Sequence, residues 1–257
     1  LTTQIQWTSP SVKSSCMSKL STILSSAVND GLIEKNPIAG LELPKKDKNR
    51  VDPFTQEEAS QIIEAFYNHK KPEIRIYGAF VEFAFYTGMR LGEIAALTWD
   101  NVDVDKKRIY VCAVVANQEI VNRTKTNTTR HVLLNSKALN ALSQAEGYLV
   151  SFGRSKGEHP YVFPSAYESS FLPSTNHLYK LWVRLLKKLG IRHRKPYCAR
   201  HTYATLCLMA GMNPAFIAKQ LGHSMDMLLG TYAQWLSSTD DWSQMDKLGP
   251  KLDQGKE

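Results

Sequence analysis

Cysteine is scarce in this sequence, and its few cysteines form no pattern. The 257 residues include 4 cysteines, which are Cys16, Cys112, Cys198 and Cys207. They show no C-x-x-C pair and no regular spacing, so neither a zinc site nor a disulfide framework is predicted. This cysteine usage instead indicates a reducing cytoplasm.

Long apolar runs are also missing. No stretch approaches the ~18 consecutive apolar residues of a transmembrane helix. The first residues, LTTQIQWTSP, carry neither the basic n-region nor the apolar h-region of a signal peptide. We therefore expect a soluble protein. The sequence starts without Met, inside a region with the pattern of a helical unit, so we also expect that an N-terminal part precedes it.

Positive charge, in contrast, is in excess. Lys and Arg number 32 against 24 Asp and Glu, which gives a formal net charge of +8. This balance favours an anionic partner, with nucleic acid first and an acidic membrane surface second. Charge alone fits a merely basic protein equally well. The 43% of hydrophobic residues indicates a folded protein with a buried core.

A polar, charged stretch divides the sequence into two folding units. Between Ser11 and Val28, apolar residues recur with helical spacing, which predicts one amphipathic helix. The later stretch KKDKNR has no apolar anchor and is typical of a linker. We therefore assign residues 1–44 to a small helical unit, residues 45–52 to a linker and residues 53–257 to a larger domain.

The larger domain is predicted to be mainly α with a small antiparallel β-sheet, an α+β fold. Thr55 and Glu58 form a capping box at the start of its first helix. Residues 74–86 are apolar on nearly every face, as in a central helix, and a further helix is predicted from Leu91 to Trp99. Strands are then expected at 108–115, 119–123 and 131–134, followed by helices at 138–148, 177–189, 202–210 and 214–221.

Three segments place phosphate-binding side chains beside predicted helix ends. They are TGMRLGE with Arg90, RKPYCARHTYAT with Arg200, and LGHSMDMLLGTY with His223 and Tyr232. A guanidinium offers a planar fork to two phosphate oxygens, and a helix N-terminus adds free N–H donors. Each residue also has an ordinary alternative. Arg90 can pair with Glu93 on the next turn, which would also orient it, and most tyrosines are core or rim residues.

Taken together, these segments resemble the tyrosine recombinase (phage integrase) family in order, spacing and flanking residues. T-G-x-R-x-G-E resembles the first arginine box of that family, R-H-T-x-A-T the second, and L-G-H with the later T-Y the histidine and nucleophile box. TKTNTTRHVLL resembles its sheet-turn element, and DGLIEKNP the end of its core-binding domain. The resemblance covers nearly all of the chain. It implies the integrase catalytic fold, with residues 1–44 as the C-terminal remnant of the helical (SAM-like) core-binding domain.

The resemblance implies a role for five side chains in cutting and rejoining DNA at specific sites. Arg90 and Arg200 clamp the scissile phosphate and stabilise its transition state, and Lys125 donates a proton to the leaving 5′ oxygen. His223 hydrogen-bonds the phosphate, while Tyr232 attacks it to form a 3′-phosphotyrosyl link. Because this link conserves the bond energy, rejoining would require no ATP, and on the pattern of the family the resemblance implies no metal ion and no other cofactor.

Two of the implied positions have alternatives. The second box usually carries His three residues before its arginine, but Tyr197 stands there, and a phenol is ill suited to proton transfer near neutrality. Tyr197 is therefore expected to act by positioning. Lys125 has the alternative role of a solvated cation on the DNA backbone, and His201 that of packing beside the arginine. The residues expected to bind DNA are Arg123, Arg130, His201 and Lys195.

The expected partner is double-stranded DNA at attachment sites, for integration or excision of a phage or other mobile element. In the resembled family the C-terminal helix often docks on a neighbouring protomer. A homotetramer with exchange of residues 233–257 is therefore expected, in a bacterial or phage-infected cell, although this tail could also pack on its own domain. Two other functions stay open: a catalytically weakened integrase-like DNA-binding or regulatory protein, and a type IB topoisomerase-like strand transferase. The change at Tyr197 is the only hint of the first.

Overall fold

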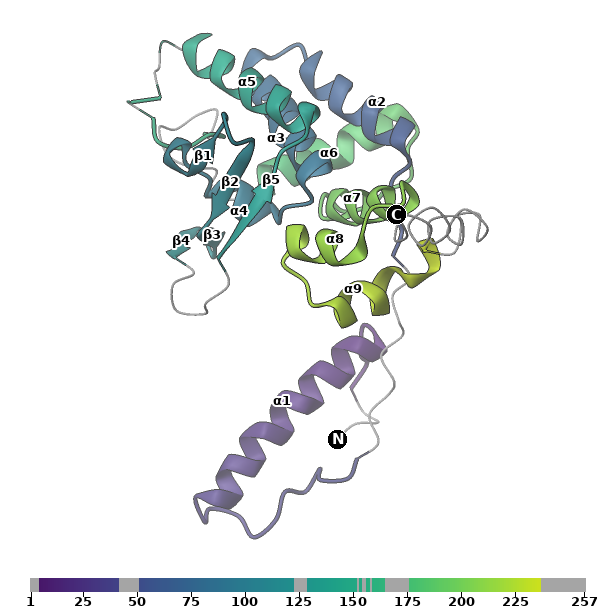
Figure 1. Cartoon of the computed structure of the whole chain (residues 1–257). Helices are drawn as coiled ribbons and strands as arrows, with labels where there is room; N and C mark the ends of the chain where they lie inside the picture. The colour runs from purple at the N-terminus through teal and green to yellow at the C-terminus, as the bar shows by residue number, and fades with distance from the viewer. Residues whose placement is uncertain are drawn as a thin grey trace, which may run out of the picture. The chain divides into compact units, whose positions relative to one another are not determined.

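The structure, a computed structural model, is described for residues 5–41, 51–122, 129–151, 153, 156–157, 159–164 and 176–236. The chain divides into two compact units, Leu1–Arg50 and Val51–Glu257, and each is described by itself (Figure 1). The assignment of the first unit to a core-binding domain stays a prediction.

The first unit contains one long helix, α1 (Pro10–Asn29), where the sequence predicts one. Ser9 accepts a hydrogen bond from the backbone N–H of Val12 at 3.2 Å and so caps the first turn. Beyond the helix, the Asn36 side chain donates to the carbonyl oxygen of Ser21 at 3.1 Å. This bond ties the segment that follows α1 back onto the helix.

The second unit is built around α3 (Pro72–Thr87) (Figure 1). Most of its residues are buried, as the apolar pattern predicts. α2 (Gln56–Tyr67), α5 (Ser136–Ser151) and α7 (Cys198–Met209) all pack against it. The helix ends at Gly88, whose φ of 63° lies in the left-handed region that glycine adopts most readily.

The remaining helices surround this centre. α2 begins at the predicted capping box, where Thr55 and Glu58 exchange two hydrogen bonds. α6 (Asn176–Leu189) packs against α2, and its Trp182 is 1% exposed. α7, α8 (Pro214–Leu221) and α9 (Met225–Tyr232) pack in succession, each on the next. The sequence pattern predicts α6, α7 and α8 but not α9.

Two short antiparallel sheets replace the single three-stranded sheet predicted. β1 (Val102–Asp103), β2 (Arg108–Val111) and β5 (Arg130–Leu133) form one sheet in the order β1-β2-β5. β3 (Ala113–Ala116) and β4 (Glu119–Asn122) form a separate hairpin. The predicted strand 108–115 is thus split at Cys112, because its two halves pair with different partners.

The helix predicted from Leu91 to Trp99 is also shorter than expected. α4 (Leu91–Ala95) ends after one turn and a half, and a 3₁₀ turn follows at Trp99–Asn101. α4 lies against β3, where a Cβ on Gly92 would meet the carbonyl oxygen of Val115 at 2.7 Å. This close approach fixes the first arginine motif against the hairpin.

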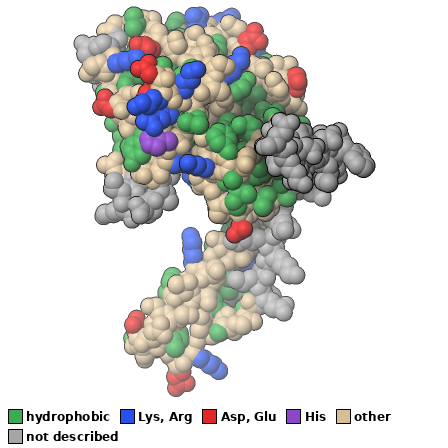
Figure 2. Space-filling view, viewed as in Figure 1, with side chains coloured by type: hydrophobic (Ala, Val, Ile, Leu, Met, Phe, Trp, Pro, Cys, Tyr) green, Lys and Arg blue, Asp and Glu red, His purple; other side chains and the backbone are tan. Residues whose placement is uncertain are grey.

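The architecture is mainly helical with small antiparallel sheets, so the predicted fold class is confirmed. Figure 2 shows Lys and Arg side chains gathered over the strands of the second unit, where Lys106 and Lys107 are exposed. Within the described ranges, no helix has both the length and the apolar character needed to cross a membrane.

Candidate active site

Arg200 lies in the first turn of α7, and its guanidinium joins three parts of the chain. The residue is only 2% exposed. Nη1 donates to the carbonyl oxygen of Gly88 at 2.8 Å, and Nη2 donates to the carbonyl oxygen of Leu221 at 2.6 Å. Nη2 also lies 2.7 Å from Nε2 of His223. The three sequence motifs therefore meet at this one side chain.

Two buried nitrogens at this meeting point are left without a partner. Among the described residues, neither Nε of Arg200 nor Nδ1 of His223 has a hydrogen-bond acceptor. Because Nε2 of His223 accepts from Arg200, its Nδ1 carries the proton, and both nitrogens are donors. Buried donors without acceptors are costly. A phosphate supplies acceptor oxygens of the kind that these two groups lack.

Burial and neighbouring positive charges lower the pKa values of Arg200 and His223. Burial, and then the positive charge of Arg90, lowers the pKa of Arg200 to about 10, so the guanidinium stays protonated at pH 7. Burial, and then the charge of Arg200, lowers the pKa of His223 to about 4. His223 is therefore neutral at pH 7, as its acceptance of a hydrogen bond from Arg200 requires.

Glu93 holds two further arginines in place. Nη1 of Arg90 donates to Oε1 of Glu93 at 3.0 Å, which confirms the predicted pairing. Arg130 binds the same carboxylate through Nη1 at 3.2 Å and Nη2 at 2.7 Å, and its Nε donates to the carbonyl oxygen of Gln220 at 2.9 Å. Burial alone would raise the pKa of Glu93, but the hydrogen bonds and charge of Arg130, with those of Arg90, lower it to about 2.

Tyr232 is the last residue of α9 and is 1% exposed. Its hydroxyl oxygen lies 2.6 Å from Nδ1 of His201, the neighbour of Arg200 on α7. Burial raises the pKa of Tyr232 to about 12, although the charge of Arg200 acts in the opposite direction. The phenol is therefore un-ionised at neutral pH and hydrogen-bonded to a histidine.

The family model described as "Phage integrase family" matches residues 53–238. The chain belongs to the phage integrase family. Prophage integrase IntR of Escherichia coli (strain K12) is 31% identical to it over 240 residues, which are 86% of this chain and 57% of IntR. IntQ of the same strain, which is named as a defective protein, is 28% identical over 245 residues, 88% of this chain and 60% of IntQ. The chain thus spans less than two thirds of these relatives.

Solved structures of integrases share the fold. The Tn1549 transposon integrase in complex with a circular intermediate DNA superposes with a TM-score of 0.69 at 21% identity, covering 91% of this chain and 78% of that one. A lambda integrase dimer bound to a COC′ core site superposes with a TM-score of 0.64 at 19% identity, covering 89% and 74%. The second unit therefore has the integrase catalytic fold, as the sequence resemblance implies.

The structure of this integrase-family chain brings the described catalytic residues predicted from the sequence close to one another. Arg200, His223 and Tyr232 lie around the N-terminal turn of α7 and the ends of α8 and α9. Arg90, from a distant part of the sequence, is near enough for its charge to act on Arg200 and His223. Tyr197 is 42% exposed, and its ring meets that of His201 edge-on at 5.2 Å.

The residues predicted to bind DNA have different surroundings. Lys195 is exposed, whereas the Arg130 side chain is 9% exposed and directed to Glu93. The partners seen for Arg130 are within the protein, so its contact with DNA stays a prediction. His201 contacts Tyr232, which the sequence does not predict. Lys125 and Arg123 lie outside the described residues.

Several groups of the site carry no signal in the sequence. The carbonyl oxygens of Gly88 and Leu221 are main-chain atoms, so no residue type in the sequence predicts their role. Arg130 does stand in the resembled sheet-turn segment, but nothing there predicts its bond to Glu93. In the part of the chain that the structure describes, no group of three or more His, Cys, Asp or Glu side chains could hold a metal ion.

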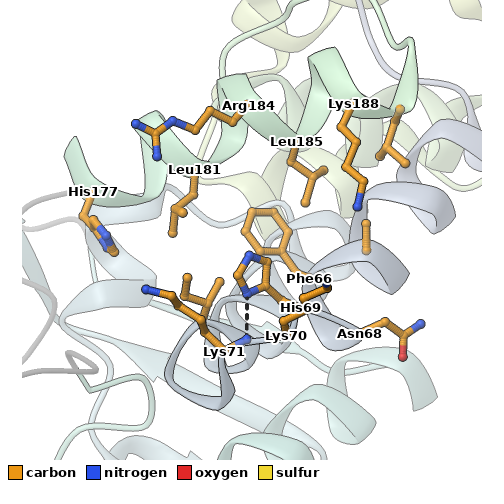
Figure 3. A pocket seen from close by; sticks show the side chains of 13 residues that line it. Phe66, Asn68, His69, Lys70, Lys71, His177, Leu181, Arg184, Leu185 and Lys188 are labelled. Carbon is orange, nitrogen blue, oxygen red and sulfur yellow. Dashed lines mark hydrogen bonds between the residues drawn. The ribbon is translucent and has the colours of Figure 1, made fainter.

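A separate groove of about 600 Å³ lies between the end of α2, the start of α3 and one face of α6 (Figure 3). Among the described residues that line it, none is predicted for catalysis and none carries a carboxylate. We call it the α2–α6 groove. Its lining includes the apolar side chains Phe66, Ile74, Leu181, Leu185 and Leu189 and the basic side chains Lys70, Lys71, Arg184 and Lys188.

Proposed function

We propose that this chain belongs to a site-specific DNA recombinase that cuts and rejoins DNA through a 3′-phosphotyrosyl link at Tyr232. The observation that carries the proposal is the contact set of Arg200. Its guanidinium binds Gly88 and Leu221 and lies 2.7 Å from His223, so one buried cation joins the three motifs of the family. Family membership supports the same activity.

The arginines supply the electrostatic part of this chemistry. When an oxygen attacks a phosphodiester, negative charge builds up on the non-bridging oxygens, and cations held in place stabilise it most. Glu93 orients Arg90, while main-chain carbonyls orient Arg200. Neither guanidinium therefore has to reorganise when the phosphate arrives. The unpaired Nε of Arg200 and Nδ1 of His223 are donors suited to its oxygens.

Tyr232 and Lys125 supply the covalent steps. The phenol oxygen of Tyr232 bonds to phosphorus while the bond to the 5′ oxygen breaks, and Lys125 protonates the leaving oxygen. A 5′ hydroxyl from a second strand then attacks the phosphotyrosyl link and releases Tyr232. Because Tyr232 is 1% exposed, its surroundings must shift before a phosphate reaches the oxygen. Tyr197 takes a positioning role in this scheme.

Double-stranded DNA is the proposed partner. The net charge of +8 favours an anionic ligand, and two integrases with the same fold are named as complexes with DNA, one with a circular intermediate and one at a core site. Arg123, Arg130 and Lys195 are proposed to contact its backbone. Assembly as a homotetramer through exchange of the C-terminal tail, and a cytoplasmic location, are parts of the same proposal.

Formation of a protein–DNA adduct tests this function. The chain and its Tyr232→Phe variant are incubated with a nicked suicide duplex that carries the attachment site of the element encoding the chain. An adduct on a denaturing gel from the parent alone is expected. An equal adduct from Tyr232→Phe would contradict the assignment of the nucleophile.

A catalytically weakened integrase is the second candidate, because IntQ is named as a defective protein and Tyr197 replaces the usual His. It predicts DNA binding without an adduct, in this chain and in the full-length protein alike. A type IB topoisomerase-like activity would instead give relaxed plasmid in place of recombinant DNA from paired sites.

A further inference from the structure

We propose that His201 is the base that takes the proton from Tyr232 when this residue attacks DNA. The inference rests on the proposed phosphotyrosyl function and adds to it the group that activates the nucleophile.

The contact between the two side chains is direct. Nδ1 of His201 lies 2.6 Å from the phenol oxygen of Tyr232, and the ring centroids are 5.7 Å apart at an interplanar angle of 53°. A base must lie within hydrogen-bond distance of the proton that it takes, and this pair meets that condition. Arg200 and His201 are neighbours in the first turn of α7, so one rigid element presents the phosphate-binding group and the base.

Tyr232 needs such a base because its environment does not ionise it. Burial raises the pKa of the phenol to about 12, even though the charge of Arg200 opposes that effect. With this pKa, about one phenol in 10⁵ is ionised at pH 7. The nearby arginines therefore do not create a nucleophile by themselves, and the proton must pass to a neighbouring group as the oxygen attacks.

His201 suits the role of base better than His223 or Tyr197, the two other candidates near Tyr232. Burial, and then the charge of Arg200, lowers the pKa of His201, so its imidazole is neutral and can accept a proton. His223 already lies 2.7 Å from Arg200 through Nε2. Tyr197, whose ring meets His201 edge-on at 5.2 Å, is a phenol and no base near neutrality.

Binding of a phosphate would strengthen this base. The charge of Arg200 disfavours a second positive charge on His201 in the free protein. A phosphate held by Arg200 brings negative charge into the same region and offsets that repulsion. His201 then becomes a better proton acceptor at the moment when the scissile phosphate is in place.

The proton and the electron pairs balance over both chemical steps. In the first, the O–H bond of Tyr232 breaks, its proton goes to Nδ1 of His201 and its oxygen bonds to phosphorus. The bond from phosphorus to the 5′ oxygen breaks, and that oxygen takes a proton from Lys125. In the second step, an incoming 5′ hydroxyl returns its proton to Lys125 and bonds to phosphorus. Tyr232 leaves and recovers its proton from His201.

Two substitutions separate a base from a group that only positions the phenol. His201→Asn can keep a hydrogen-bond acceptor near the place of Nδ1, but it cannot take a proton. His201→Ala removes both properties. Adduct formation is measured in single turnover on the nicked duplex from pH 6 to 9, together with DNA binding and Tm. His69→Asn, in the loop between α2 and α3, is the matched control.

We expect both His201 variants to form the adduct about 10²- to 10⁴-fold more slowly than the parent at pH 7. The deficit should shrink as the pH rises, because hydroxide can replace the missing base. DNA binding should stay at the parental value. The Tm should stay near the parental value in His201→Asn, whereas His201→Ala leaves the buried Tyr232 hydroxyl without its partner and should lower it. His69→Asn should react as the parent does.

A second substrate distinguishes the base from the acid. In a duplex whose leaving 5′ oxygen is replaced by sulfur, the thiolate leaves without being protonated. This duplex should restore the rate of Lys125→Ala, which lacks the proposed acid, and leave both His201 variants slow.

Three results would overturn the role of His201: a parental rate in His201→Asn, a faster adduct from either variant, or recovery of both variants on the sulfur substrate. If the parent itself forms no adduct, the proposed function fails together with the base. If the parent reacts and His201→Asn matches it, only the role of His201 fails.

Discussion

Replacing Glu93 by Gln removes one buried negative charge from the site. Glu93 is 1% exposed and binds the guanidinium groups of Arg90 and Arg130. Gln keeps the shape of the side chain but removes the negative charge, which leaves two cations close to Arg200. Lowering of the Glu93 pKa from its ordinary 4.5 to about 2 corresponds to about 3 kcal/mol in favour of the ionised form. We expect Glu93→Gln to lower the free energy of unfolding by about that amount, in line with the ~3–5 kcal/mol for breaking a buried ion pair.

Thermal unfolding measures this effect. For a unit of this size, each kcal/mol lowers the Tm by about 2–4 °C, so a fall of about 6–12 °C is expected at pH 7. The ionised carboxylate contributes stability that is present above pH 4.5 and is lost as the pH falls through about 2. The difference in Tm between parent and variant should therefore shrink over that range.

An exposed ion pair serves as the control. Glu146 binds Lys156 at 2.8 Å with both side chains more than 40% exposed, and Glu146→Gln should change the stability by less than about 1 kcal/mol. A Glu93→Gln protein with the parental Tm at pH 7, or with a deficit that does not change with pH, would refute the reasoning about Glu93.

Three further predictions follow from the same geometry. A Cβ on Gly88 would meet the ring of Tyr203 at 2.4 Å, at a φ of +63°, so Gly88→Ala should lower the denaturant midpoint by an amount equivalent to about 1–3 kcal/mol. Lys has no planar fork of donors, so Arg200→Lys cannot bind the carbonyl oxygens of Gly88 and Leu221 and a phosphate together. Adduct formation should therefore fall by about 10²-fold or more, while DNA binding falls less. His223, whose pKa is lowered to about 4, should titrate near that value by NMR. Since unfolded His223 binds a proton more readily, the stability that it contributes should decline as the pH drops from 6.5 towards 4.

Each of these predictions has its own check. Gly147 has open space where a Cβ would stand, so Gly147→Ala should be neutral or stabilising by up to about 1 kcal/mol. A Gly88→Ala protein as stable as Gly147→Ala would contradict the steric account. An unchanged adduct rate in Arg200→Lys would show that the reaction does not need a guanidinium at position 200. A His223 midpoint at its ordinary value near 6.5 would show that neither burial nor the charge of Arg200 lowers its pKa.

Local patterns in the sequence predict the helices well. The apolar stripe of α1, the capping box of α2 and the apolar faces of α3 each fix an element through neighbouring residues alone. α9 (Met225–Tyr232) was missed because a glycine interrupts its eight residues and only two of them are buried. The split of the predicted strand at Cys112 depends on two different partner strands, which no window of the sequence contains.

The candidate site shows the same division. The resemblance identifies Arg90, Arg200, His223 and Tyr232 by their motifs. It does not predict that Tyr232 meets His201, because the two are 31 positions apart and meet only when α9 packs at the N-terminal turn of α7. Nor does it predict that Arg130 shares Glu93 with Arg90, since β5 must first be placed beside α4 and α8.

The main-chain acceptors of Arg200 have a consequence for how this site can vary. The carbonyl oxygens of Gly88 and Leu221 are present whatever side chains those positions carry. Substitution at position 221 can therefore alter packing without deleting an acceptor, provided that the ends of α3 and α8 keep their course. The orientation of the guanidinium is encoded in the path of the backbone. The orientation of Arg200 therefore depends more on the course of the backbone than on which side chains positions 88 and 221 carry.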